Sequence, residues 1–233
     1  MNLLGINADA KTSKGIALNV LTGILYLAPS DESQTINTCA YASAGCRMAC
    51  LYTAGRGAMS NVRKARIAKT VMFAKQRDVF MQKLVQDVEA LVKKAAKLGM
   101  QAAVRLNGTS DLPWENVKYQ GKSIMDMFPS IQFYDYTKSI ERIRKYALGQ
   151  MPSNYHLTLS RSESNQPAVE EAIALLVNVA VVFDGALPET YMGVPVINGD
   201  ATDVRFKDPV GVVVGLKAKG KAKKDASGFV VAA

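Results

Sequence analysis

The sequence predicts an α/β fold: a single domain, residues 1–233, forming a complete or partial (β/α) TIM-like barrel with mainly parallel strands and an N-terminal hairpin. Two observations favour this class. After residue 100, short apolar runs alternate with helical segments, as in parallel strands joined by crossover helices. The runs are also almost continuously apolar, as expected of strands buried on both faces. With 48% hydrophobic residues, the chain has ample material for one core.

The first thirty residues indicate the hairpin. Two apolar runs, 14–20 and 24–27, flank Thr22-Gly23, a pair that suits a tight turn. A polar segment then leads into a cysteine-rich loop at 37–57. We therefore expect the hairpin to open the sheet and the loop to follow it directly.

A long helix is predicted after this loop. Apolar residues recur there at helical spacing, Ser60 or Asn61 is placed to cap the start, and Gly99 is placed to end it. Since about forty residues is long for one helix, we expect a break between Gln76 and Val79.

The rest of the chain reads as alternating strands and helices, followed by a basic, low-complexity tail at 217–233. No change in composition indicates a second domain. We expect strands at 102–106, 131–135, 155–160, 179–183, 194–197 and 210–215, with helices at 123–128, 139–148 and 168–177.

Polar residues follow nearly every predicted strand. The C-terminal ends of parallel strands meet at one rim, where α/β enzymes place their sites. Turns use the same residue types, so one polar residue after a strand indicates little. Repetition across six strand ends favours a functional rim. We predict Asp135, Lys138, Arg161, Asp184 and Asp200 as catalytic residues, and Asn107, Ser160, Asn198 and Lys217 as cofactor-binding residues.

All three cysteines of the chain, Cys39, Cys46 and Cys50, fall within twelve residues. An odd number of thiols does not make a closed disulfide framework. The sequence shows neither a signal peptide nor an apolar run long enough to span a membrane, so we expect a cytoplasmic protein with reduced thiols. Thiolates are soft ligands, which select zinc, copper(I) or iron–sulfur clusters.

The number of thiols favours a [4Fe-4S] cluster at these three metal ligands. Zinc calls for a fourth protein ligand, and the single histidine, His156, lies in a predicted strand, where a packed side chain is the more common role. A cluster normally has four cysteines, so three leave one iron open to a substrate or cofactor. A structural zinc site and three free thiols remain the alternatives.

The net charge of +9 supports a second hypothesis, a protein that binds nucleic acid or a host factor. Basic residues concentrate at 63–77 and 217–224, although a solvated basic face would look the same. The aromatic residues among them, Phe73 and Phe80, are expected in the core, which gives base stacking little support. Neither a P-loop nor a Gly-x-Gly-x-x-Gly turn is present, which disfavours a nucleotide kinase or a Rossmann dehydrogenase.

Two long blocks resemble the bacteriophage family named after gene product 88. The first runs from Cys39 to Arg66 and includes Cys-Ala-Tyr-Ala-Ser-Ala-Gly-Cys-Arg-Met-Ala-Cys; the second, from Val196 to Gly220, includes Val-Ile-Asn-Gly-Asp and Gly-Leu-Lys-Ala-Lys-Gly. The resemblance covers about residue 16 to Val231. It implies a phage protein in the cytoplasm of a bacterial host and supplies no reaction.

The order of elements is similar to that of radical S-adenosylmethionine enzymes, in which a three-cysteine loop follows the first strand of a partial barrel. Their usual spacing is C-x3-C-x2-C, whereas this chain has C-x6-C-x3-C. The resemblance implies a [4Fe-4S] cluster, S-adenosylmethionine as a further cofactor, and an enzyme acting on a small molecule at the rim.

Overall fold

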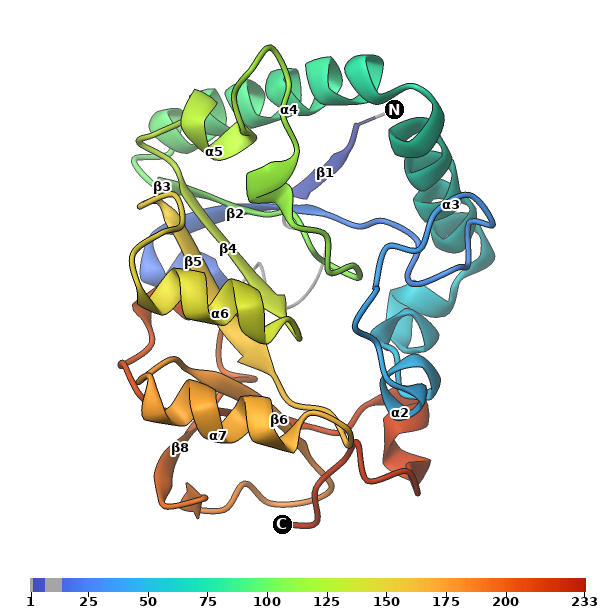
Figure 1. Cartoon of the computed structure of the whole chain (residues 1–233). Coiled ribbons are helices and arrows are strands. Elements are labelled where there is room, and N and C mark those ends of the chain that lie inside the picture. The colour runs from blue at the N-terminus through green and yellow to red at the C-terminus, as the bar shows by residue number, and fades with distance from the viewer. Residues whose placement is uncertain (1, 7–13) are drawn as a thin grey trace.

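The computed structural model describes residues 2–6 and 14–233, and these form one nine-stranded mixed sheet with helices packed against it (Figure 1). The strand order is β1-β2-β3-β4-β5-β6-β9-β8-β7. Among the neighbouring strands that the structure describes, β1–β2 and β7–β8 pair antiparallel and the others pair parallel. The strands are β1 (Leu4–Ile6), β2 (Val20–Leu25), β3 (Gln101–Arg105), β4 (Gln132–Thr137), β5 (Tyr155–Ser160), β6 (Val179–Phe183), β7 (Thr190–Tyr191), β8 (Val194–Asn198) and β9 (Val213–Lys217).

Helices connect most of the parallel strands, as the alternating pattern predicts. None of the described helices is both long and apolar enough to cross a membrane. The α-helices are α2 (Ala44–Met48), α3 (Ser60–Lys75), α4 (Arg77–Lys97), α5 (Ile124–Met127), α6 (Ile140–Ala147) and α7 (Gln166–Ala174); the 3-10 helices are η1 (Ile16–Leu18), η2 (Leu51–Thr53), η3 (Gly55–Ala58), η4 (Trp114–Asn116), η5 (Arg205–Lys207) and η6 (Gly220–Lys224).

The two faces of the sheet are covered differently because strand side chains alternate between them. On one face, Phe133 and its neighbours join the main core, which includes Leu84 of α4, Ile143 of α6 and Val169 of α7. On the other face, Tyr134 belongs to a smaller cluster with Val204, just before η5. Helices therefore cover one face, and the segment around η5 packs on the other.

The α/β class and the mainly parallel sheet are confirmed, but closure into a barrel is not. Strands β1 and β7 stand at the two ends of the strand order, and within the described residues no pairing joins them. The TIM-like barrel therefore stays a prediction that the sheet topology does not support.

The predicted N-terminal hairpin is wrong in its turn. Thr22 and Gly23 lie inside β2, and residues 16–18 of the expected first strand form η1. Gly23 is needed for packing: a Cβ there would lie 3.0 Å from Cδ2 of Leu91 and 3.2 Å from Cδ1 of Leu4. The antiparallel neighbour of β2 is instead β1, earlier in the chain.

The long helix breaks where the sequence predicts. Gln76, with φ −136° and ψ 55°, separates α3 from α4. Gly99 follows the end of α4 with a φ of +63°, a conformation that glycine adopts at little cost. The start differs from expectation, because Met59 is the N-cap and no side chain caps it.

Candidate functional site: a cavity lined by three cysteines

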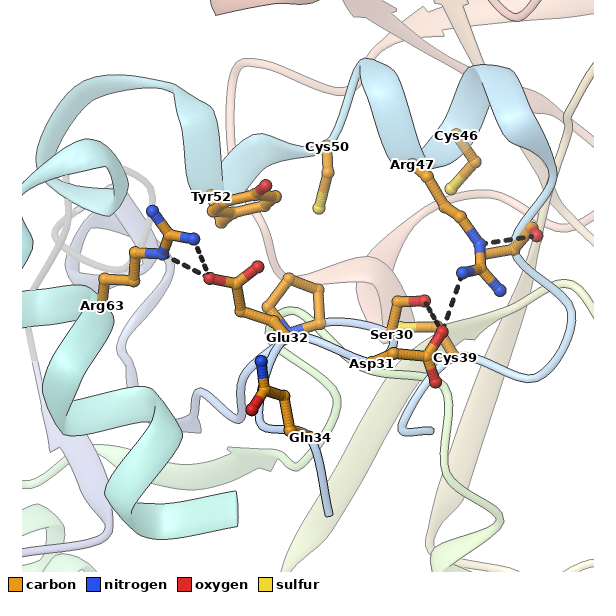
Figure 2. Close-up of a pocket in the computed structure, with 12 residues that line it drawn as sticks. Ser30, Asp31, Glu32, Gln34, Cys39, Cys46, Arg47, Cys50, Tyr52 and Arg63 are labelled. Carbon is orange, nitrogen blue, oxygen red and sulfur yellow. Dashed lines mark hydrogen bonds and ion pairs between the residues drawn. The ribbon is translucent and has the colours of Figure 1, made fainter. Parts of the chain in front are cut away.

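A cavity of about 400 Å³ lies beside the segment that follows β2, and all three cysteines line it (Figure 2). Cys46 is on α2 and Cys50 directly precedes η2, while Cys39 lies on the opposite wall near Ser30 and Asp31. All three are free and half-buried. The fold therefore brings the predicted metal ligands to one cavity, although their role as ligands stays a prediction.

Local hydrogen bonds fix the cysteine loop to the ends of the strands. The Thr38 hydroxyl donates to the carbonyl of Ala28 at 2.6 Å, and the backbone N–H of Asp111, after β3, donates to the Thr38 carbonyl at 2.8 Å. Further on, Ser43 caps α2 by accepting from the N–H of Cys46 at 3.2 Å. These contacts set the positions of both cysteine-bearing walls.

Glu163, in the loop after β5, holds α2 in place through hydrogen bonds. Its carboxylate accepts from the Ser43 hydroxyl at 2.7 Å and from the N–H of Gly45 at 2.8 Å. Gly45 permits this close approach, since a Cβ there would lie 2.1 Å from Oγ of Ser227 and 2.8 Å from Glu163. A side chain 120 residues away thus positions the cysteine helix.

The C-terminal segment closes around the same loop. Arg161 donates to the carbonyls of Gly228 at 2.5 Å and Phe229 at 2.9 Å. The Lys138 ammonium lies 5.8 Å from the centre of the Phe229 ring. Arg161, a predicted catalytic residue, therefore holds the chain end in place.

Two of the thiols, Cys39 and Cys50, are buried enough for their pKa values to rise. Burial raises the pKa of Cys39, and it raises the pKa of Cys50 to about 11; the neighbouring sulfurs of the trio add to both effects. Backbone N–H groups of Ser30 and Tyr52 act in the opposite direction by hydrogen bonding to the sulfurs of Cys39 and Cys50 respectively. Cys50 is therefore protonated at neutral pH, and binding a metal would release its proton.

Two cations lie close enough to Cys50 to favour its thiolate. Lys138 lowers the pKa of Cys50, against the larger effect of burial. The Arg66 guanidinium lies 4.7 Å from the centre of the Tyr26 ring and interacts electrostatically with Cys50. Nε and Nη1 of Arg66 are buried with no hydrogen-bond partner among the described residues. Nothing in the sequence marks Arg66 apart from its basic neighbours.

The charged side chains on the cavity walls neutralise one another. Arg47 pairs with Asp31 at 2.9 Å, and Arg63 pairs with Glu32. Sequence reasoning missed both carboxylates as part of the site, because they lie before the cysteines in what reads as an ordinary polar loop.

Apart from Arg161, the predicted rim residues separate into three groups. Nearest the cysteines, the Lys138 ammonium donates to the Ser160 hydroxyl at 2.8 Å, and Lys138 also acts on Cys50. This pair is the part of the predicted rim that the fold brings toward the metal ligands.

A second group is buried beneath the rim. Asp135 accepts from the N–H of Asn107 at 2.7 Å and from the Tyr155 hydroxyl at 2.8 Å, and burial raises its pKa to about 7. The loop that Asn107 begins carries Thr109, whose carbonyl lies 3.7 Å from Sγ of Cys39. Asp135 and Asn107 thus support the rim from below.

The third group has no contact with the cysteines that the structure records. Asp200 accepts from the N–H of Lys217 at 2.9 Å, and the Asn198 amide oxygen accepts from the N–H of Asp200 at 3.0 Å. Asp184 is exposed and accepts from the N–H of Ala233 at 3.1 Å. None of these four lines the cysteine cavity. The catalytic and cofactor-binding roles of all the rim residues stay predictions.

Within residues 2–6 and 14–233, no group of three or more His, Cys, Asp or Glu side chains converges closely enough to hold a metal ion as the side chains stand. His156 is a packed residue of β5: its Nδ1 lies 2.9 Å from the Tyr146 hydroxyl, and burial lowers its pKa to about 4. It does not line the cysteine cavity.

Fold and cavity together define an α/β protein with a three-cysteine loop at the C-terminal ends of its parallel strands. The chain belongs to the Gene product 88 family, whose match spans residues 2–233. This confirms the phage family that the two sequence blocks indicate. No curated protein and no solved structure gives a significant match to the chain.

Proposed function

We propose that the protein is a phage-encoded iron–sulfur protein in which Cys39, Cys46 and Cys50 hold a [4Fe-4S] cluster with one open iron. The observation that carries the proposal is that all three cysteines of the chain line one cavity. The donors are chemically suited, because thiolates select iron–sulfur clusters among a few soft metals. We place the protein in the cytoplasm of the bacterial host.

The surroundings of the sulfurs support this ligand set. Hydrogen-bonding groups around sulfur are a common outer-shell feature of cluster sites, and here the Thr38 hydroxyl lies 3.8 Å from Sγ of Cys39. Lys138 and Arg66 place positive charge beside Cys50, which favours an anionic centre. A cube-shaped cluster is also larger than a single ion, so its sulfurs stand farther apart than those around one zinc.

We further propose an enzyme that acts on a small molecule, with S-adenosylmethionine as the leading cofactor. When bound, a cluster with an open iron supplies a coordination position for amino and carboxylate groups. Lys138 would hold a carboxylate, and Ser160, which accepts from Lys138 at 2.8 Å, would orient that ammonium. The C-terminal segment held by Arg161 would limit access of water to the site.

Anaerobic reconstitution with iron and sulfide tests the proposal. The wild-type protein is expected to take up about four irons and four sulfides per chain, as a [4Fe-4S] cluster requires. A variant with all three cysteines changed to serine is expected to take up none while keeping its fold. A folded wild-type protein that takes up no iron would contradict the proposal.

A further inference from the structure

Two segments of the chain carry many cations and no acidic residue. Residues 33–77 contain eight Lys or Arg side chains and no Asp or Glu, and residues 209–224 contain five lysines and no Asp or Glu. The positive charge of the protein is therefore concentrated in two stretches that lie far apart in the sequence.

The fold places these two stretches side by side. The helix η6 packs against η2, and a Cβ built on Gly220 would lie 2.8 Å from Cβ of Ala54. Figure 1 shows the red η6 next to α2, at the same end of the molecule as the cysteine loop. We call the outer side of residues 41–64 together with 220–224 the cationic surface.

Several of the thirteen cations are already engaged by the protein. Arg47 and Arg63 pair with carboxylates of the cavity, Lys69 donates to the Leu3 carbonyl, and Lys219 pairs with Asp200. By contrast, the side chains of four exposed lysines of the cationic surface make no hydrogen bond or ion pair in the part of the chain that the structure describes: Lys64, Lys221, Lys223 and Lys224.

The first of the two segments also carries exposed apolar side chains. Tyr41 is 54% exposed, and Met48, Leu51 and Met59 on the same loop are exposed to a similar degree. Tyr52 lies in the wall of the cavity. Lysines that contact phosphates, combined with an exposed aromatic ring on which a base can stack, are the two elements of single-stranded nucleic-acid binding.

We infer that the cationic surface binds single-stranded nucleic acid, with Lys64, Lys221, Lys223 and Lys224 on the phosphates and Tyr41 stacked on a base. Phe73 and Phe80 are core residues, as the sequence predicts, and take no part. The inference depends on charge, exposure and the packing of η6 on η2, and it requires no metal at the cysteines.

Fluorescence anisotropy with labelled oligothymidylate and oligouridylate tests this inference, using the full chain between about 50 and 200 mM salt. Changing Lys221, Lys223 and Lys224 together to glutamine is expected to weaken binding about tenfold or more. The slope of log K against log salt should fall by about 2, because each phosphate contact on a single strand contributes about 0.7.

Two matched variants separate this surface from overall charge. Lys93, Lys94 and Lys97 are exposed on α4, at its end near the start of β3, and changing these three to glutamine removes the same charge. That variant should bind like the wild type. Tyr41→Ala should weaken binding about fivefold or more, and Tyr41→Phe should restore it, because the phenyl ring still stacks.

Other outcomes would overturn the inference. Equal loss of affinity in both lysine variants would show general charge attraction only. Equal affinity for duplex DNA, or binding only to an acidic protein, would contradict recognition of a single strand. Iron uptake without oligonucleotide binding would contradict this inference and leave the proposed function standing. Oligonucleotide binding without iron uptake would contradict the proposed function and leave this inference standing.

Discussion

The cysteine cavity and the buried network beneath the rim differ in how their polar groups are satisfied. In the buried network, Arg142 makes two hydrogen bonds to Glu115 at 2.8 and 2.9 Å, one to Asp111 at 3.0 Å and one to Tyr155 at 2.9 Å. Tyr155 in turn donates to Asp135. Every charged member has a partner inside the protein.

The cysteine cavity has the opposite character. Its carboxylates and arginines neutralise each other on the walls, but the Cys39 sulfur has only weak hydrogen bonds. Arg66, which interacts electrostatically with Cys50, keeps two buried nitrogens without a partner among the described residues. A network whose bonds are complete within the protein serves to fix the rim. The cysteine sulfurs have few partners within the protein, and a bound ligand would supply the missing ones.

Breaking the buried network should have the largest effect on stability. Arg142→Met leaves the Asp111 and Glu115 carboxylates buried without their partner, and we expect a loss of about 3–5 kcal/mol in the free energy of unfolding. Arg144→Met, on the exposed side of the same helix, is the matched control and should change little. Urea denaturation measures the free energy of unfolding of both variants. Equal losses would show that the buried network contributes no more to stability than an exposed ion pair.

Asp135 should make stability depend on pH. Its pKa rises from 3.8 to about 7 on folding because of burial, so its contribution is complete below pH 3.8 and is lost as the pH rises through 7. Relative to Asp135→Asn, the wild type should therefore lose a few kcal/mol of unfolding free energy across that interval. A difference between the two proteins that is constant with pH would contradict a buried, neutral Asp135.

Weakening the hydrogen bonds between Glu163 and α2 should have a smaller effect on stability, and it should also change the cysteine cavity. Glu163→Gln replaces one acceptor oxygen by an amide, so either the Ser43 hydroxyl or the Gly45 N–H loses its acceptor, at a cost of about 1 kcal/mol. Iron uptake should fall with it. Glu170→Gln, exposed on α7, is the control and should affect neither. Unchanged iron uptake in Glu163→Gln would show that Glu163 does not position the cysteines.

Changing a cysteine should affect stability least. Cys50 is half-buried and serine is close to it in size, so Cys50→Ser should cost less than about 1 kcal/mol. The same variant should lose its bound iron. Calorimetry and iron analysis of one preparation compare the two effects, and a large loss of stability would place Cys50 with the structural residues.

The fold could be predicted largely from local patterns. The parallel strands from 101 onward follow from continuous apolar runs, and the division of the long helix at Gln76 follows from its length and position. The sequence pattern wrongly predicts a turn at Thr22-Gly23, because Gly23 serves packing against Leu91 and Leu4, which no local pattern shows. Barrel closure depends on pairing between the two ends of the sheet, which is equally invisible in local sequence.

The site could be predicted only in part for the same reason. Cysteine spacing indicated one shared centre, and the cavity agrees with that. Asn198 and Lys217 end strands that lie beyond β6 in the strand order, whereas the cysteine loop follows β2, and neither residue lines the cysteine cavity. Glu163 and Arg66 act through tertiary contacts and carry no signal in sequence.

Elemental analysis of protein purified without oxygen decides whether the three cysteines hold a cluster. We expect about four irons with matching acid-labile sulfide per chain, the visible absorption of an iron–sulfur cluster, and loss of all three signals on changing Cys39, Cys46 and Cys50 to serine. One zinc per chain, or a folded protein with neither metal, would contradict this expectation.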